Sequence, residues 1–228
     1  MLEQLAVASS KKKPAVIGAG PGPSQLKFGD GARGFFGEFP SNEFISGSAL
    51  ASLVGLTSGT LRNDASSWLK FILDGEIIYV PKLPIRYALT WNQLNAVNLI
   101  NGSKEISVQG FNLSIGLLKG ADADPGVNGS GNYVDGSHHS EWSRLLYPLI
   151  KNDADLPAGI VNPLAPYANA DLGLTSSDAG RSWCQEVHGF GPTHRVLRGG
   201  SSVTGFWNSS ATSNSLAFGW RPRLGLII

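Results

Sequence analysis

The sequence predicts an α+β fold that is rich in β-strands, with short helices and hairpins. Three observations support this prediction. Glycine accounts for 29 of the 228 residues, roughly twice its usual share, which favours many turns over long helices. Charged residues make up only 15%, against about 25% in a typical soluble domain. Short runs of β-branched and aromatic residues turn at Asp-Gly and Gln-Gly pairs, as hairpins do.

Residues 1–40 are predicted to be an extended N-terminal assembly arm, because glycines at their density do not sustain a regular element. The densest stretches are GAGPGP (18–23) and GDGARGFFGEFP (29–40). The phenylalanines of this segment require burial, so we expect them to dock on the body of the protein or on a neighbouring subunit. These assembly residues are Phe35, Phe36 and Phe39. Residues 41–228 are predicted to form a β-rich body.

Three patterns define elements in the first half of the body. WLKFILDGEIIYV (68–80) predicts a hairpin that turns at Asp74-Gly75, since both residues tolerate positive φ. Thr90 followed by Gln93 is a capping-box pattern and predicts the start of a short helix. ISVQGFNLSIGLL (106–118) alternates apolar residues at period two and predicts a second hairpin.

SEWSRLLYPLI (140–150) predicts a helix that packs on the core, because its apolar residues recur at i, i+3, i+4 and i+7. Pro148 is expected to shorten or kink this helix. The preceding segment, residues 121–136, contains Asp and Asn residues that could surround Ca²⁺. An EF-hand loop needs a carboxylate at its twelfth position, where this segment has Tyr133. A polar loop rich in turns is therefore the expected structure, and Ca²⁺ binding stays open.

The last segment, residues 181–228, predicts strands that close the domain. RVLRGGSS (195–202) runs into two adjacent glycines, where the backbone can reverse or let another strand approach closely. In FGWRPRLGLII (218–228), Pro222 is tolerated mainly near a strand start or edge. The residues after it alternate between two faces, one of them wholly apolar. The predicted buried face consists of Trp220, Leu224, Leu226 and Ile228.

The pairing of RVLRGGS with GWRPRL resembles the closing strands of the C-type-lectin-like fold. The resemblance is to the version shared by formylglycine-generating-enzyme-like domains and many bacteriophage receptor-binding and tail proteins. Over most of residues 60–228 the chain also resembles a phage virion-protein family. The matching segments are SSWLKFILDGEIIYVPKLPIRYALTWNQLN (66–95), SVQGFNLSIGLLKG (107–120), SEWSRLLYPL (140–149), SWCQE (182–186) and GWRPRL (219–224). These resemblances imply a C-type-lectin-like body.

The sequence does not predict an enzyme. Formylglycine-generating enzymes bind copper through a pair of cysteines, whereas this chain has Cys184 alone, so the resemblance concerns the fold. His188 and His194 lie near Cys184, but no third group stands out to orient a nucleophile, and a single cysteine is expected to be buried and unreactive. The neighbours His138 and His139 lack zinc-motif spacing. We therefore expect no catalytic residue, metal or cofactor.

Charge and cysteine content indicate where the protein acts. A net charge of +1 without a basic face argues against nucleic-acid binding, and Lys11-Lys12-Lys13 is expected to be a solvated tail. No stretch approaches the roughly 18 apolar residues of a membrane helix. The single cysteine excludes an internal disulfide, and residues 1–25 lack a signal-peptide pattern. We expect synthesis in the host cytoplasm and a final location in the virion.

A candidate ligand-binding surface lies in VTGFWNSSATSNSLA (203–217). Aromatic rings among small hydroxyl and amide side chains are typical of adaptable recognition loops, and a flat ring can also stack on a sugar. The alternative is that this segment packs in the core or at a subunit interface. The candidate ligand-binding residues are Phe206, Trp207, Asn208 and Asn214.

The expected function is that of a non-enzymatic phage virion structural protein of the tail, baseplate or tail fibre. Its partners would be copies of itself and other virion proteins. One alternative is a receptor-binding tip protein that recognises a host glycan or protein, and another is a capsid decoration protein. Low charge and the apolar arm favour the structural role, whereas the aromatic, Ser- and Asn-rich segment favours the tip.

Overall fold

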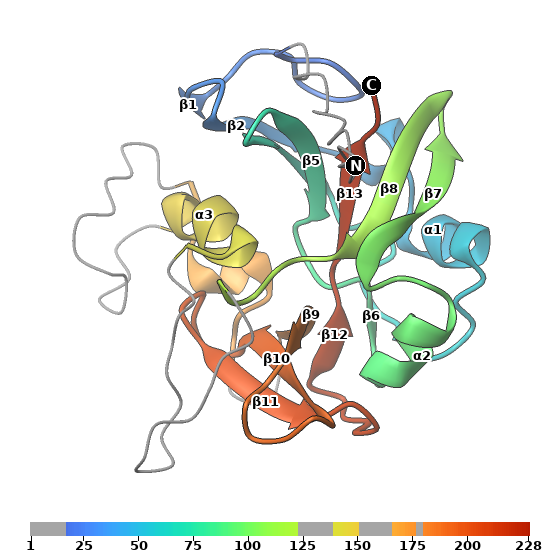
Figure 1. Cartoon of the computed structure of the whole chain (residues 1–228). Coiled ribbons are helices and arrows are strands. Elements are labelled where there is room, and N and C mark those ends of the chain that lie inside the picture. The colour runs from blue at the N-terminus through green and yellow to red at the C-terminus, as the bar shows by residue number, and fades with distance from the viewer. Residues whose placement is uncertain (1–16, 123–138, 151–165, 177–179) are drawn as a thin grey trace, which may run out of the picture.

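The computed structural model describes residues 17–122, 139–150, 166–176 and 180–228. These residues form two β-sheets and a few short helices (Figure 1). The β-rich α+β class predicted from the sequence is thereby confirmed.

The larger sheet has seven strands in the order β1-β2-β4-β5-β13-β8-β7, and all neighbouring strands are antiparallel. Its strands are β1 (Phe28–Gly29), β2 (Arg33–Phe39), β4 (Trp68–Leu73), β5 (Glu76–Pro81), β7 (Asn101–Val108), β8 (Phe111–Leu117) and β13 (Pro222–Leu226). The two predicted hairpins are β4–β5 and β7–β8, and both are confirmed. Their turn residues have positive φ, 51° at Asp74 and 52° at Gln109, each followed by a left-handed glycine.

The smaller sheet has six strands in the order β11-β10-β9-β12-β6-β3. Its strands are β3 (Thr60–Leu61), β6 (Arg86–Tyr87), β9 (Arg181–Val187), β10 (His194–Gly199), β11 (Phe206–Ser210) and β12 (Phe218–Trp220). Strands β12 and β9 are parallel and the other pairs are antiparallel. Strand β11 therefore lies at one edge of this sheet.

Short helices connect and cover the sheets. They are η1 (Ser41–Glu43), α1 (Gly47–Val54), α2 (Trp91–Ala96), α3 (Glu141–Leu146), η2 (Tyr147–Leu149) and η3 (Asn169–Leu172). The predicted capping box is confirmed at α2, where Gln93 N–H donates to Thr90 Oγ1 and Thr90 N–H donates to Gln93 Oε1. The predicted helix over 140–150 is also present, and it changes to a 3₁₀ turn just before Pro148.

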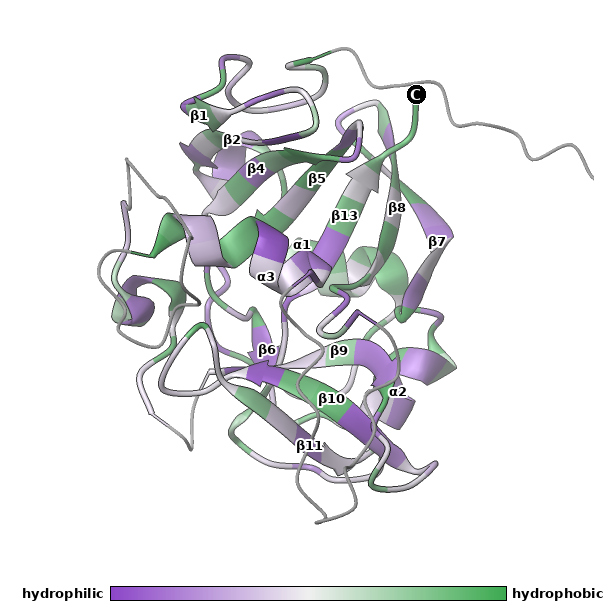
Figure 2. Cartoon of the chain, turned by 60° about the vertical axis from the view of Figure 1, so that its left-hand side comes forward, coloured by the Kyte–Doolittle hydropathy of each residue, from purple (hydrophilic) through white to green (hydrophobic). Residues whose placement is uncertain are grey.

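Two apolar clusters occupy opposite faces of the central strands. Along β4, Trp68 and Ile72 pack in a cluster with α1, α2 and the smaller sheet, while Leu69 and Phe71 pack in a cluster with α3. Helix α3 lies across one face of the larger sheet in Figure 2, where hydrophilic segments of α3 and β13 lie near one another. Because both faces of β4 and β5 are covered, these strands are buried along almost their whole length.

The closing segment joins the two sheets. Strand β12 pairs with β9 and β6 in the smaller sheet, and after Arg221 the chain continues as β13 between β5 and β8 of the larger sheet. Pro222 is the first residue of β13, as its restricted backbone predicts. The predicted buried face is confirmed for Trp220, Leu224 and Leu226. It is wrong for Ile228, which is 58% exposed, because β13 ends at Leu226.

The prediction of an arm over residues 1–40 needs correction. Residues 33–39 form β2, which pairs with β4 in the larger sheet. Phe35, Phe36 and Phe39 are buried in the fold itself, so they dock on the body rather than on a neighbour. The glycines of this segment suggest an interrupted strand. Strand β2 tolerates Gly37, which has φ 136°, because the pairing with β4 shifts register between Phe35 and Gly37. Residues 1–16 lie outside the described residues.

Candidate functional site

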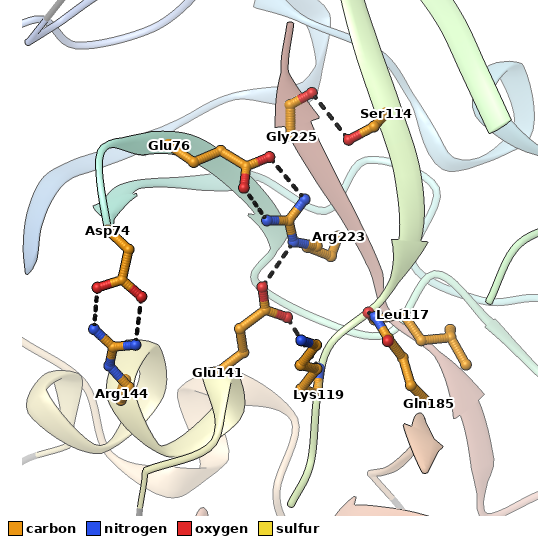
Figure 3. Close-up of polar contacts among 10 residues, drawn as sticks. All are labelled: Asp74, Glu76, Ser114, Leu117, Lys119, Glu141, Arg144, Gln185, Arg223 and Gly225. Carbon is orange, nitrogen blue, oxygen red and sulfur yellow. Dashed lines mark hydrogen bonds and ion pairs between the residues drawn. The ribbon is translucent and has the colours of Figure 1, made fainter. Parts of the chain in front are cut away.

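A group of charged side chains lies where α3, the β4–β5 hairpin and β13 meet (Figure 3). Arg223 of β13 donates from Nη1 and Nη2 to the two carboxylate oxygens of Glu76, at 3.1 and 2.7 Å. Its Nε donates to Glu141 Oε1 at 3.0 Å. Such a two-pronged contact fixes orientation as well as charge. Nearby charge and these hydrogen bonds raise the pKa of Arg223 despite its burial, so the guanidinium stays charged.

A second ion pair flanks the first. Arg144 of α3 and Asp74 at the hairpin turn form two hydrogen bonds of 2.6 Å each. Hydrogen bonding from Arg144 holds the pKa of Asp74 below its usual range. Together the two pairs line a cavity of about 490 Å³, whose wall also includes Lys119, Asp122 and His139. The ion pairs thus link helix α3 to the larger sheet.

Glu186 of β9 lies beneath the same region. Gly120 N–H donates to its Oε2 at 3.0 Å. Burial, with a smaller contribution from Glu141, nevertheless raises the pKa of Glu186 to about 7. Cys184, two residues earlier, is fully buried, and burial raises the pKa of its thiol well above the usual value. A buried protonated thiol is a poor nucleophile, which agrees with the expectation of an unreactive cysteine.

Two further arginines of the closing motifs are buried. Arg198 of β10 donates from Nη2 to Tyr147 Oη at 2.6 Å, and its guanidinium lies 5.3 Å from the Phe206 ring centre. Arg221 donates to the carbonyl of Leu172 and lies 5.5 Å from the ring centre of Trp142. The two hydrogen bonds link these arginines to the 3₁₀ helices η2 and η3. The arginines of RVLRGG and GWRPRL therefore have internal packing partners.

The N-terminal part of the described chain forms a strap, residues 17–24, which lies against the larger sheet. Buried Lys70 donates from Nζ to the carbonyls of Gly18 and Gly20, both at 3.2 Å, and lies 5.1 Å from the Phe36 ring centre. Tyr79 Oη donates to the carbonyl of Pro21 at 3.3 Å. Burial lowers the pKa of Lys70 to about 8. The GAGPGP sequence is thus a fitted segment and not a free linker.

The sequence-predicted ligand residues are divided between a strand and a turn. Phe206, Trp207 and Asn208 lie in edge strand β11 and are half-buried, whereas Asn214 is exposed in the turn that follows. Trp207 Nε1 donates to the carbonyl of Gly199 at 2.9 Å, and the Arg181 guanidinium lies 4.1 Å from its ring centre. These contacts place the indole against its own fold. Ligand binding by the four residues stays a prediction.

Among the residues that the structure describes, the two most exposed large apolar side chains lie close to this strand. They are Phe190, 60% exposed, and Leu216, 63% exposed. Phe190 belongs to the β9–β10 turn and Leu216 to the turn between β11 and β12, and a hydrogen bond of 2.7 Å from Ala211 N–H to the carbonyl of Thr193 joins the two turns. We call residues 188–194 and 211–217 the tip surface.

Sequence reasoning missed both Phe190 and the ion pairs of Arg223. Phe190 lies between two glycines in HGFGP, a turn composition that signals exposure of an aromatic residue and could have drawn attention to it. The ion pairs offered no signal, because Glu76, Glu141 and Arg223 are far apart in the sequence.

Metal and membrane features are limited within the described parts of the chain. There, no group of three or more His, Cys, Asp or Glu side chains is arranged to hold a metal ion. Within the same residues no helix is long and apolar enough to span a membrane. Most of the candidate Ca²⁺ segment 121–136, and His138 with it, lies outside the described residues.

Comparison of the chain with protein families, curated proteins and solved structures gives no match.

Proposed function

We propose that this chain is a non-enzymatic structural protein of a bacteriophage virion, in the tail, baseplate or tail fibre. The proposal includes a C-type-lectin-like fold for the body. Its support is the order and spacing of the motifs over residues 60–228. The arrangement of the charged residues is compatible with a mechanical role, because Arg223 and Arg144 join separate elements through ion pairs.

The observation that carries the proposal is the exposure of apolar side chains at two opposite ends of the fold. At one end, where the chain terminates, Ile227 and Ile228 are 38% and 58% exposed, and Phe111 is nearby because Ile227 N–H donates to the carbonyl of Asn112. At the other end lie Phe190 and Leu216 of the tip surface. Exposed apolar groups of this kind mark interaction sites. A subunit with exposed apolar side chains at both ends can contact a neighbouring subunit at each end, as a structural protein of a particle does.

Replacement of the apolar groups at the terminal end tests this function. We expect the double variant Ile227→Ser, Ile228→Ser to fold, because both side chains are exposed, but to enter particles less efficiently. Leu53→Ser is the matched control, since Leu53 is 48% exposed on α1. Incorporation is measured by quantifying the chain in purified particles. Equal incorporation of the double variant and the control would count against an assembly role for this end.

A receptor-binding role is the second candidate. The exposed ring of Phe190 favours it, because aromatic rings are common contacts in recognition surfaces. Under this reading the terminal end joins the particle and the tip surface contacts the host.

A further inference from the structure

We infer that the tip surface binds an uncharged saccharide, with Phe190 as the ring on which a sugar stacks. The inference rests on the proposed function, in which the opposite end of the molecule joins the particle. In Figures 1 and 2 the C-terminus lies at one end of the molecule, and strands β10 and β11 lie at the other. A subunit attached through its terminal end would therefore present the tip surface to a partner outside the particle.

The β9–β10 turn holds Phe190 in a fixed position. Phe190 N–H donates to His188 Nδ1 at 3.1 Å, and Gly191 N–H donates to the carbonyl of His188 at 3.1 Å. The edge of the turn is closed by His194 N–H, which donates to the carbonyl of Gly191 at 2.9 Å. The His194 ring packs on Phe190 with centres 4.7 Å apart, inclined by 68°. The aromatic ring is thus ordered before any ligand arrives, which lowers the entropic cost of binding.

The second turn of the tip surface is ordered in the same way. Thr212 and Ser210 join their hydroxyls at 2.9 Å, and Ser213 N–H donates to the carbonyl of Ser210 at 2.9 Å. At the far side of the turn, Ala217 N–H donates to Ser215 Oγ at 3.1 Å. Leu216 projects from this closed turn and is exposed. Folding gains little from a phenylalanine and a leucine left in water, so their exposure is better explained by contact with a partner.

The chemistry of the two turns selects the class of partner. Residues 189–194 and 211–217 contain no Asp, Glu, Lys or Arg. Their exposed polar groups are hydroxyls and an amide, from Thr193, Thr212 and Asn214. Hydroxyl and amide groups both donate and accept hydrogen bonds, as the hydroxyls of a sugar require. The apolar face of a pyranose ring can cover an exposed aromatic ring. A strongly charged partner would find no complementary charge on the residues of these turns, and the guanidinium of the adjacent Arg195 already donates from Nη1 to the carbonyls of Pro192 and His194, at 2.7 and 2.9 Å.

Binding of the purified full-length chain to immobilised neutral oligosaccharides tests the inference. The panel contains glucose, galactose, mannose and N-acetylglucosamine units, with sulfated and sialylated oligosaccharides as charged comparators. We expect binding to at least one neutral member and a loss of roughly tenfold for Phe190→Ala, which is equivalent to about 1.4 kcal/mol. Binding should be retained in Phe190→Trp, because tryptophan keeps an aromatic face for stacking. Leu53→Ala, which removes an exposed apolar side chain elsewhere, should bind like the native chain.

Three outcomes would overturn the inference. They are no binding to any neutral oligosaccharide, equal binding by Phe190→Ala and the native chain, and a change of oligomeric state in Phe190→Ala, which would make the tip surface a protein interface. Thermal melting of each variant verifies folding, and Asn214→Ala provides a second probe of the same surface. Particle incorporation of Phe190→Ala separates the two proposals. Normal incorporation of Phe190→Ala, together with no binding of neutral oligosaccharides by the native chain, would refute only the saccharide inference, whereas loss of incorporation would place the tip surface in assembly.

Discussion

Arg223 joins three elements through hydrogen bonds to Glu76 and Glu141. Arg223 is 9% exposed, so removal of its side chain would leave two carboxylates near each other with little water to screen them. We predict that Arg223→Ala lowers the free energy of unfolding by about 3–5 kcal/mol, the usual effect of breaking a buried ion pair. Urea denaturation measures this change.

The control for that experiment is Arg33→Ala, at the exposed start of β2. A surface substitution of this kind is expected to change stability by less than about 0.5 kcal/mol. An equally small change in the unfolding free energy for Arg223→Ala would mean that the ion pairs of Arg223 do not stabilise the packing of α3 on the sheet.

Glu186 gives the fold a distinctive pH dependence. Its pKa is raised from 4.5 to about 7, so the folded state binds the proton more tightly than the unfolded state does. The resulting stability is fully present below pH 4.5 and is lost as the pH rises through about 7. The native chain should therefore lose on the order of 3 kcal/mol of unfolding free energy across this range, and we predict that Glu186→Gln abolishes this loss.

The pH experiment compares unfolding free energies of the two proteins at several pH values. The comparison is needed because burial lowers the pKa of His188, which changes stability in the opposite direction below pH 6.5. Carboxylates whose pKa is lowered, such as those of Asp74 and Glu38, change the unfolding free energy only at lower pH. Parallel pH profiles for the native chain and Glu186→Gln would show that Glu186 ionises normally.

At the scale of elements, the strap depends on the close fit of Gly20. A Cβ at this position would lie 2.2 Å from Tyr79 Oη, in a backbone conformation with φ 79°. We predict that Gly20→Ala releases the strap, with a cost of about 1–2 kcal/mol from the left-handed backbone and about 1–3 kcal/mol more from overpacking. Hydrogen exchange of the backbone amides in residues 17–24 should accelerate.

Gly55→Ala is a matched control for the strap. Gly55 has φ 76° and no atom within 4 Å of the added Cβ, so it shares the backbone strain without the clash. The account requires Gly20→Ala to be the more destabilising of the two. Equal costs would mean that contact with Tyr79 does not hold the strap in place.

Local patterns predicted the elements that local chemistry determines. The turns at Asp74 and Gln109, the capping box at Thr90 and the shortened helix before Pro148 each depend on a few adjacent residues. The arm was misassigned because β2 gains its stability from pairing with β4, which no pattern within residues 33–39 reveals. Strand β11 was expected as a loop for the same reason, since β10 supplies its hydrogen bonds.

The candidate sites were less predictable than the elements. Trp207 has the composition of a ligand residue, yet its N–H and ring are engaged by Gly199 and Arg181. The exposure of Phe190 depends on the turn geometry set by His188 and Gly191. Composition can thus locate a recognition segment, but tertiary contacts decide which aromatic ring stays free.

For the whole molecule, the closing segment contributes an interior strand to each of the two sheets. We predict that removal of residues 219–228 prevents folding, because it takes one strand from the interior of each sheet. Trp220, Leu224 and Leu226 are buried, and each large apolar side chain contributes about 1.5–3 kcal/mol. Their sum is comparable with the roughly 5–15 kcal/mol of a whole domain.

Removal of residues 227–228 alone is the control, because both side chains are exposed beyond the end of β13. This shorter truncation should remain soluble and melt cooperatively. Circular dichroism and thermal melting of both truncations test the prediction. Cooperative melting of the longer truncation would show that β12 and β13 are dispensable for the fold.

Electron cryo-microscopy of assembled particles tests the central claim most directly, namely that the chain is a virion subunit attached through its terminal end. The account predicts density for this fold in the tail, baseplate or tail fibre, with Ile227 and Ile228 against a neighbouring subunit and Phe190 facing solvent. Density in the capsid shell would instead favour a decoration protein. Absence of the chain from purified particles, or burial of Phe190 against a neighbour while the terminal end faces solvent, would contradict the account.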